Sequence, residues 1–313
     1  MKRIPIFRNA LGWNNKVDPV ELAYDAETGS SELAVAYNVD VSRRGRVSRR
    51  KGFVKRVDLA GIHSLFSCPF VTLFCAGDGV YKLNEDFSYN LIADGAPEGV
   101  RTSYAEVNRV VYAINPGMKI KVVDGVVSAF VREGSYVGPV TIRQYMDPPT
   151  GSHIAYYSSR MYIAKDNVLW ASDPAAFAWF NKGNGFRQFE SRITMLRPVT
   201  TGIYVSTENG VWYLYGKTFN EMQQKLVFSY PAVEWSDCYT LFSGLRSPYL
   251  MERGFYAECA VWLGRNSEGQ TSVCVGGDDG RVVDMTVDKI DAPAGIFAAS
   301  IIHDDKFIGL IQG

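Results

Sequence analysis

The densest group of charged side chains in this chain lies in residues 43–56, which read RRGRVSRRKGFVKR. Eight of these residues are basic, six of the eight are arginine, and none is acidic. Guanidinium groups bind phosphate and carboxylate groups through paired hydrogen bonds, and a row of cations attracts a polyanion or an acidic protein surface. We call these residues the basic strip and expect them to contact DNA or a neighbouring subunit: Arg43, Arg44, Arg46, Arg49, Arg50, Lys51, Lys55 and Arg56.

The basic strip also has a purely structural interpretation. Lysine and arginine on an exposed edge strand discourage pairing with strands of other molecules. The whole chain carries 33 basic and 33 acidic residues, so its formal net charge is zero. This balance excludes a surface built throughout to hold nucleic acid, and any such contact must be local.

Signatures of catalysis are absent from the sequence. It has no GxxxxGK[ST] phosphate loop, no HExxH and no GxSxG, and its three histidines are far apart. The Asp278–Gly280 segment lacks the alternating carboxylates of a calcium loop and is typical of a hairpin turn. We therefore expect a protein that is not an enzyme, with no cofactor and no metal. The odd number of cysteines, without a CxxC pair, predicts reduced core thiols at Cys68, Cys75, Cys238, Cys259 and Cys274.

The basic strip belongs to a predicted β-hairpin. Val35, Tyr37, Val39 and Val41 alternate with smaller or polar residues, a period of two that predicts a strand with one buried row. A turn is expected at Arg44–Gly45, because glycine adopts positive φ at little cost, and the return strand is expected over residues 47–57.

Further hairpins recur along the chain at intervals of about 40 residues. Their turns are expected near residues 45, 79, 117, 167, 210 and 280, where Asp-Gly, Asn-Gly, Pro-Gly and similar pairs separate runs of strand-forming residues. The strand pairs after the first are expected at 73–76 with 80–83, 110–113 with 119–122, 161–164 with 168–170, 203–206 with 211–214, and 272–275 with 281–283. The long last interval predicts an insertion, in the Ser243–Gly254 region or in the Asn266–Gln270 loop.

This repeat predicts an all-β fold, a β-propeller of about six four-stranded blades. A two-sheet sandwich is the alternative, but it would not usually repeat a strong hairpin at this spacing. Residues 1–31 are expected to be an extended N-terminal arm, and residues 32–313 a single propeller domain. The strand-like segments 297–302 and 306–311 are expected to join the opening hairpin, so that N- and C-terminal strands close the ring. No apolar run approaches the roughly 20 residues of a membrane span.

One alternative function concerns glycans. Tryptophan rings can stack on sugars, and Trp13, Trp179, Trp235 and Trp262 are candidates if they lie at the surface. A glycan-binding propeller at a tail tip would have a deep axial pocket with converging carboxylates and exposed aromatic rings. The Ser-x-Asp-x-Gly-x-Thr-Trp box of glycosidase propellers and the dipeptides of WD40 repeats are absent.

The order of several segments resembles virion proteins of bacteriophages and prophages. These segments are GWNNKVDP, LAVAYNVDVSRRGRVSRRKGF, VRTSYAEVNRVVYAIN, SHIAYYSSRMYIAKDNVLWASDP, FESRITMLRPVTTGIYVSTENGVWYL and TSVCVGGDDGRVV. The resemblance is to the β-propeller tail-hub and nozzle proteins of short-tailed phages, including the packaged-DNA stabilisation type, and covers about residues 12–283. The chain is compact beside many such hubs, with little room for a second platform domain.

That resemblance implies a structural role without catalytic residues. It implies a homo-oligomeric ring, most often of six copies, beneath the portal and adaptor of the virion neck and near tail or fibre proteins. Such a ring, made in the bacterial cytoplasm, would surround the DNA channel, retain packaged DNA and guide its ejection, with non-specific DNA contacts and no membrane contact. A cellular propeller that serves as an interaction scaffold is the remaining alternative.

Overall fold

The computed structural model describes residues 8–42, 44–136, 138–241, 248–292, 294–303 and 306–312. Nearly all regular structure in these residues is β-strand. The exceptions among them are the helix α2 (Pro248–Glu252) and a 3-10 turn at Ile142–Gln144. No helix within the described ranges is long and apolar enough to cross a membrane. The predicted all-β class is confirmed.

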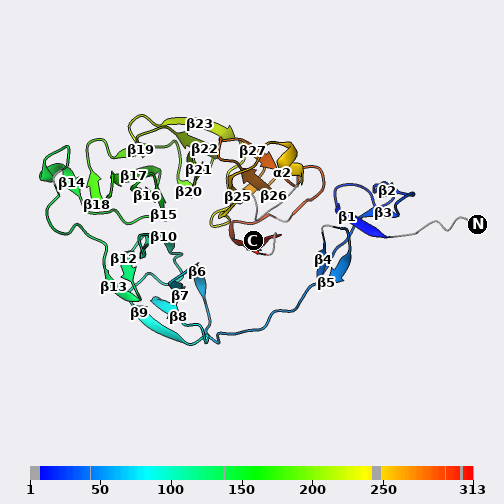
Figure 1. Cartoon of the computed structure of the whole chain (residues 1–313), viewed down its shortest axis with the longest axis horizontal. Coiled ribbons are helices and arrows are strands. Elements are labelled where there is room, and N and C mark those ends of the chain that lie inside the picture. Colours follow the sequence, from blue (N-terminus) through cyan, green and yellow to red (C-terminus); the bar gives the residue numbers. More distant parts are fainter. Residues whose placement is uncertain are drawn as a thin grey trace, which may run out of the picture.

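Successive antiparallel sheets lie around a common centre and form the blades of a β-propeller (Figure 1). The first strands of neighbouring blades contact one another in series, from β6 through β10, β15, β20 and β24 to β28, so they form the inner wall. The first blade contains β6 (His63–Cys68), β7 (Val71–Ala76), β8 (Gly79–Leu83) and β9 (Tyr89–Ala93). The second contains β10 (Ser103–Val107), β11 (Val110–Asn115), β12 (Met118–Val123) and β13 (Val126–Ala129).

The third and fourth blades continue this order. The third contains β15 (His153–Tyr157), β16 (Arg160–Lys165), β17 (Val168–Asp173) and β19 (Phe186–Gln188), extended by β18 (Ala176–Asn181) and β14 (Tyr145–Met146). The fourth contains β20 (Ile193–Val199), β21 (Gly202–Thr207), β22 (Gly210–Tyr215) and β23 (Gln223–Phe228). In these four blades the predicted hairpins are confirmed as the second and third strands.

The hairpin predicted at 272–283 exists but occupies a different place in its blade. The fifth blade contains β24 (Cys238–Leu241), β25 (Glu258–Arg265), β26 (Thr271–Gly276) and β27 (Val282–Asp284). Its second and third strands are therefore joined by residues 266–270, and the predicted hairpin supplies the third and fourth strands. This shift, together with the residues inserted between β24 and β25 around α2, explains the long interval between turns. The insertion predicted near residues 243–254 is confirmed.

In the described residues, the last sheet has two strands, β28 (Phe297–His303) and β29 (Lys306–Gln312). They are expected to share a sheet with the opening hairpin, but the described strands of that hairpin, β4 and β5, pair with each other and not with β28 or β29. An ion pair of 3.2 Å between Asp40 and Lys306 connects the two hairpins instead.

The hydrophobic core lies between adjacent blades. Between the third and fourth blades, Tyr162 and Leu169 pack in one buried cluster with Ile203 and Leu214. Between the fourth and fifth, Tyr204 packs with Trp262. The second, third and fourth blades therefore bury both of their faces against neighbouring blades, which stabilises the ring in a way that one isolated sheet cannot achieve.

The opening residues form a separate group of strands, which we call the N-terminal unit (residues 8–49, of which Arg43 lies outside the described residues). It contains β1 (Asn9–Trp13), β2 (Tyr24–Asp25), β3 (Ser30–Leu33), β4 (Val39–Val41) and β5 (Val47–Arg49). Strands β1, β2 and β3 form one sheet, and β4 and β5 form another. Residues 50–62 contain no strand and lead from this unit to the first blade (Figure 1).

Polar contacts attach the N-terminal unit to residues 287–291, which follow the fifth blade. The backbone N–H of Asn15 donates to the Lys289 carbonyl at 2.9 Å, and the backbone N–H of Asp291 donates to the side-chain oxygen of Asn15 at 2.8 Å. Lys289 also pairs with Glu32 at 2.8 Å. The structure thus forms strands within residues 8–31, where an extended arm is predicted, and the first propeller strand begins at His63. The predicted boundary at residue 31 stays a prediction.

Candidate functional site

The opening hairpin turns where the sequence predicts, but it is shorter than predicted. Gly45 has φ +75°, and a side chain there would approach Asn9 and Ala10 of β1. The first strand of the hairpin begins only at Val39, because Asn38 adopts a left-handed φ of 54°, a conformation that asparagine tolerates and that interrupts an extended strand. Strand β5 ends at Arg49, and residues 50–57 are not a strand.

The expected buried row of this hairpin is wrong at two positions. Val35 and Tyr37 precede β4 and are 62% and 86% exposed, while Val39 and Val41 are half-buried. Two further apolar side chains, Phe53 and Val54, are 87% and 71% exposed. The region around the basic strip therefore combines exposed cations with exposed apolar groups.

The basic strip is exposed at all seven of its described positions, and Arg43 lies outside the described residues. Arg44 and Arg46 are at the hairpin turn, Arg49 ends β5, and the other four follow it. Three of the seven have partners. Arg50 lies 3.6 Å from Asp40, Lys55 pairs with Asp58, and the Arg56 guanidinium lies 5.3 Å from the centre of the Phe87 ring.

The remaining described cations of the basic strip make no ion pair with another described residue: Arg44, Arg46, Arg49 and Lys51. Exposed ion pairs contribute little to stability, so these side chains are not needed to hold the hairpin together. They are available to an anionic partner.

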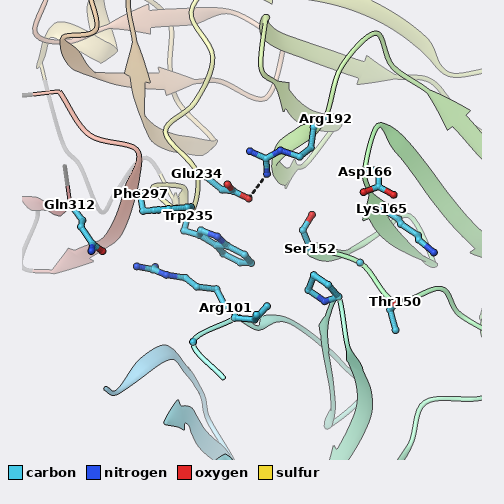
Figure 2. Close-up of a pocket in the computed structure, with 14 residues that line it drawn as sticks. Arg101, Thr150, Ser152, Lys165, Asp166, Arg192, Glu234, Trp235, Phe297 and Gln312 are labelled. Atoms are coloured by element: carbon cyan, nitrogen blue, oxygen red, sulfur yellow. Dashed lines mark hydrogen bonds and ion pairs between the residues drawn. The ribbon is translucent and has the colours of Figure 1, made fainter. Parts of the chain in front are cut away.

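A second candidate site is a pocket of about 560 Å³ at one end of the propeller axis (Figure 2). It lies where the chain enters the first strands of several blades. Arg101, Ser152 and Arg192 precede β10, β15 and β20, and Trp235 precedes β24. The turn between β16 and β17 adds Lys165 and Asp166.

Charges on the wall of this axial pocket largely neutralise one another. Arg192 Nη1 donates to Glu234 at 2.9 Å, and its Nε donates to Glu208 at 3.1 Å. Burial opposes the charge on Arg192, but both carboxylates outweigh burial and raise its pKa. Arg101 Nη1 donates to the Ala298 carbonyl at 2.9 Å, which ties the second blade to β28. Burial lowers the pKa of Arg101, although the charge of Glu234 opposes this effect.

Trp235 is the tryptophan that reaches the axial pocket. Its ring stacks on the buried His153 ring at 4.4 Å, so one face of the indole is already covered. The expectation of four surface tryptophans is wrong for Trp179 and Trp262. Trp179 is covered by Tyr136, Tyr145 and Arg132, and Trp262 packs against Tyr204 between the fourth and fifth blades. Trp13 is half-buried and donates to the Ala34 carbonyl at 3.1 Å.

The sequence analysis missed the axial pocket as a set of residues. Its members are up to about 200 positions apart, and no short motif connects them. One signal was present: many of them stand directly before the first strand of a blade. Within the described ranges, no group of three or more histidine, cysteine, aspartate or glutamate side chains could hold a metal ion. All five cysteines are free thiols. Cys75, Cys259 and Cys274 are buried, as predicted for core residues, whereas Cys68 and Cys238 are half-buried.

No protein-family model and no curated protein matches the chain. Solved structures resemble it. The WD40 domain of Neurospora crassa Pan2 is 10% identical, with 78% of this chain and 69% of that chain covered, at a TM-score of 0.46. BBS1N, crystallised with ARL6DN, is 10% identical, and the match covers 77% of this chain and 71% of that chain at a TM-score of 0.48. Saccharomyces cerevisiae Sqt1 is 12% identical, and the match covers 82% of this chain and 66% of that chain at a TM-score of 0.40. These are likenesses of fold alone, and the ring of sheets described above makes this chain a β-propeller.

Proposed function

We propose that the chain is a structural subunit of a short-tailed phage, a hub or nozzle of the tail. In this proposal several copies, six by the resemblance of the sequence, form a ring around the DNA channel, retain the packaged genome and guide its ejection. The observation that carries the proposal is the basic strip, which would contact either the DNA or the next copy in the ring. It lies outside the propeller, is exposed at its seven described positions, and has four described cations without an ion-pair partner among the described residues.

Contacts of such a ring with DNA would be non-specific. Nothing in the described fold offers a helix that could enter the major groove, so base reading is not expected. Each phosphate that a cation neutralises adds about 0.9 to the slope of log affinity against log salt concentration. Weak contacts multiplied around a ring would hold DNA and still let it slide.

The proposed role needs no catalysis, and the axial pocket is consistent with that. Its best-placed carboxylate, Glu234, is held by Arg192 and is only slightly exposed. A general acid or base needs an accessible group with a suitably placed partner. The charges of the pocket instead connect neighbouring blades.

Imaging of virions that carry the labelled protein tests the proposal. A ring on the tail axis, between the portal side and the tail tip, is the expected result. A peripheral position would favour a glycan-binding protein, and absence from the particle would favour a cellular interaction scaffold. Either of these two outcomes would overturn the proposed function.

One observation favours the glycan alternative. Trp235 lies in the axial pocket with Ser152, Thr150 and Asp166, a mixture of aromatic and polar groups that a saccharide can use. Isothermal titration calorimetry of the isolated protein with host-surface saccharides tests it. Binding that Trp235→Ala abolishes would support this alternative, and no binding would remove it.

A further inference from the structure

The first blade carries a concentration of charge opposite to that of the basic strip. Between residues 63 and 100 the chain has five acidic side chains and one lysine. All five acids are exposed: Asp78, Glu85, Asp86, Asp94 and Glu98. None forms an ion pair with a residue that the structure describes.

The outer strand of the same blade is an unpaired edge. Strand β9 pairs with β8 on one side, and in the described structure no strand pairs with its other side. Two apolar side chains of β9, Tyr89 and Leu91, are exposed. A free edge with exposed apolar side chains can accept another segment of chain.

Residues 50–57 have the complementary properties. The exposed Phe53 and Val54 lie between two pairs of cations, Arg50–Lys51 and Lys55–Arg56, and the segment forms no strand within the described structure. Among the contacts of the described residues, this segment meets the first blade of its own chain where Arg56 lies over Phe87, while Lys55 pairs with Asp58, which precedes the blade. The rest of the segment leads away to the N-terminal unit (Figure 1).

We infer that the basic strip of one copy binds the β9 side of the first blade of the next copy. The cations would face the five acids, and Phe53 and Val54 would cover Tyr89 and Leu91. This inference rests on the proposed ring of copies. A contact between two different surfaces of the same chain is head-to-tail, and such contacts generate rings when the rotation closes.

A second copy fits this surface better than DNA does. DNA would satisfy the cations but would be repelled by acidic side chains, and it would leave the β9 edge and the exposed apolar groups uncovered. A second copy covers all of them. Because charge attraction guides such association, salt should weaken it.

Two charge-reversed variants of the full chain test the inference. The first carries Arg44→Glu, Arg46→Glu and Arg49→Glu in the basic strip. The second carries Glu85→Lys, Asp94→Lys and Glu98→Lys in the first blade, three acids without side-chain hydrogen bonds to described residues. Sedimentation velocity should show that the wild type associates at low salt and that each variant alone associates more than tenfold more weakly.

An equimolar mixture of the two variants should restore assembly. In the mixture every reversed strip can meet a reversed blade, so alternating copies are complementary. A control with Lys182→Glu, Lys217→Glu and Lys225→Glu, three exposed lysines of the third and fourth blades, should assemble as the wild type does. Thermal unfolding by circular dichroism shows that each variant is folded.

Other outcomes overturn the inference. One is normal assembly of the strip variant with loss of binding to a 30-base-pair DNA duplex, which would assign the strip to DNA and keep the proposed function. Failure of the mixture to assemble, when both variants are folded, also overturns it. A wild type that remains monomeric at every salt concentration overturns it as well. The proposed function is tested separately, because absence of the protein from virions would overturn that function.

Discussion

The ring of His153 stacks on the indole of Trp235, with centroids 4.4 Å apart and planes inclined by 19°. His153 begins the first strand of the third blade, and Trp235 precedes the first strand of the fifth. The contact therefore crosses the propeller axis region and joins two blades that are not consecutive. The Nε2 atom of His153 is buried and has no hydrogen-bond partner among the residues that the structure describes.

This burial makes the stability of the propeller sensitive to acid. Burial lowers the pKa of His153 below its ordinary value of 6.5, with Asp237 and Glu234 opposing the shift and Arg197 and Arg192 adding to it. Below pH 6.5, His153 therefore binds a proton in the unfolded chain more readily than in the folded chain. Stability is fully present above pH 6.5 and falls below it, by at most about 1.4 kcal/mol per pH unit for one proton.

The variant His153→Phe keeps an aromatic ring on Trp235 and removes the titrating group. Urea unfolding between pH 7 and 5, followed by tryptophan fluorescence, should show a smaller loss of stability with falling pH than in the wild type. An unchanged slope would mean that His153 is not the group responsible.

The attachment of the N-terminal unit should depend on Glu32 and Lys289. The hydrogen bond from Lys289 lowers the pKa of Glu32 below its ordinary value of 4.5, and burial opposes this. The stabilisation that the ionised Glu32 gives to this attachment is fully present above pH 4.5. It is lost as the pH falls through the lower pKa that Glu32 has in the folded state. Lys289→Ala should cost at most about 1 kcal/mol, because the lysine is half exposed.

Hydrogen exchange of residues 9–33 measures this loss. Exchange there should accelerate in Lys289→Ala, while exchange in the blades stays unchanged. The matched control is Arg109→Ala, which removes an ion pair with Asp124 in which both side chains are exposed. Equal exchange in both variants would show that the ion pair does not hold the unit.

Gly45 should be essential to the opening hairpin. Its φ of +75° disfavours any other residue, and a Cβ would lie 2.6 Å from Asn9 Cβ and 2.8 Å from the Ala10 carbonyl oxygen. Gly45→Ala should destabilise the hairpin by at least about 1 kcal/mol. Gly52→Ala is the control, because nothing lies within 4 Å of its Cβ position. Proteolysis should cut the first variant faster within residues 38–50, and equal rates would contradict the prediction.

The hydroxyl of Tyr204 should stabilise the contact between the fourth and fifth blades. It is buried and donates to the Gly277 carbonyl at 2.6 Å. Burial strongly raises its pKa, so the neutral form persists. Tyr204→Phe leaves buried carbonyls with fewer partners and should cost about 1–3 kcal/mol. Tyr215→Phe, which removes an exposed hydroxyl bonded to Gln223, should cost under about 1 kcal/mol in the same thermal unfolding measurement.

Much of the propeller was predictable because its hairpins are local. The alternation around residues 73–83 and 203–214, with a turn between the strands, places both strands within one short segment, and their pairing needs no distant information. The turn of the opening hairpin was predictable for the same reason, since a glycine at positive φ is a local requirement.

Sequence by itself determined the all-β class, the repeat and the presence of a concentrated basic strip. Only the tertiary structure decided which strand of a blade each hairpin supplies, as the shifted hairpin at 272–283 shows. It alone showed that Trp262 is buried, that Tyr37 is exposed, and that Arg101, Arg192 and Trp235 meet at the axis. The physical reason is that strand formation depends on near neighbours, whereas burial and the composition of a site depend on residues brought together from different blades.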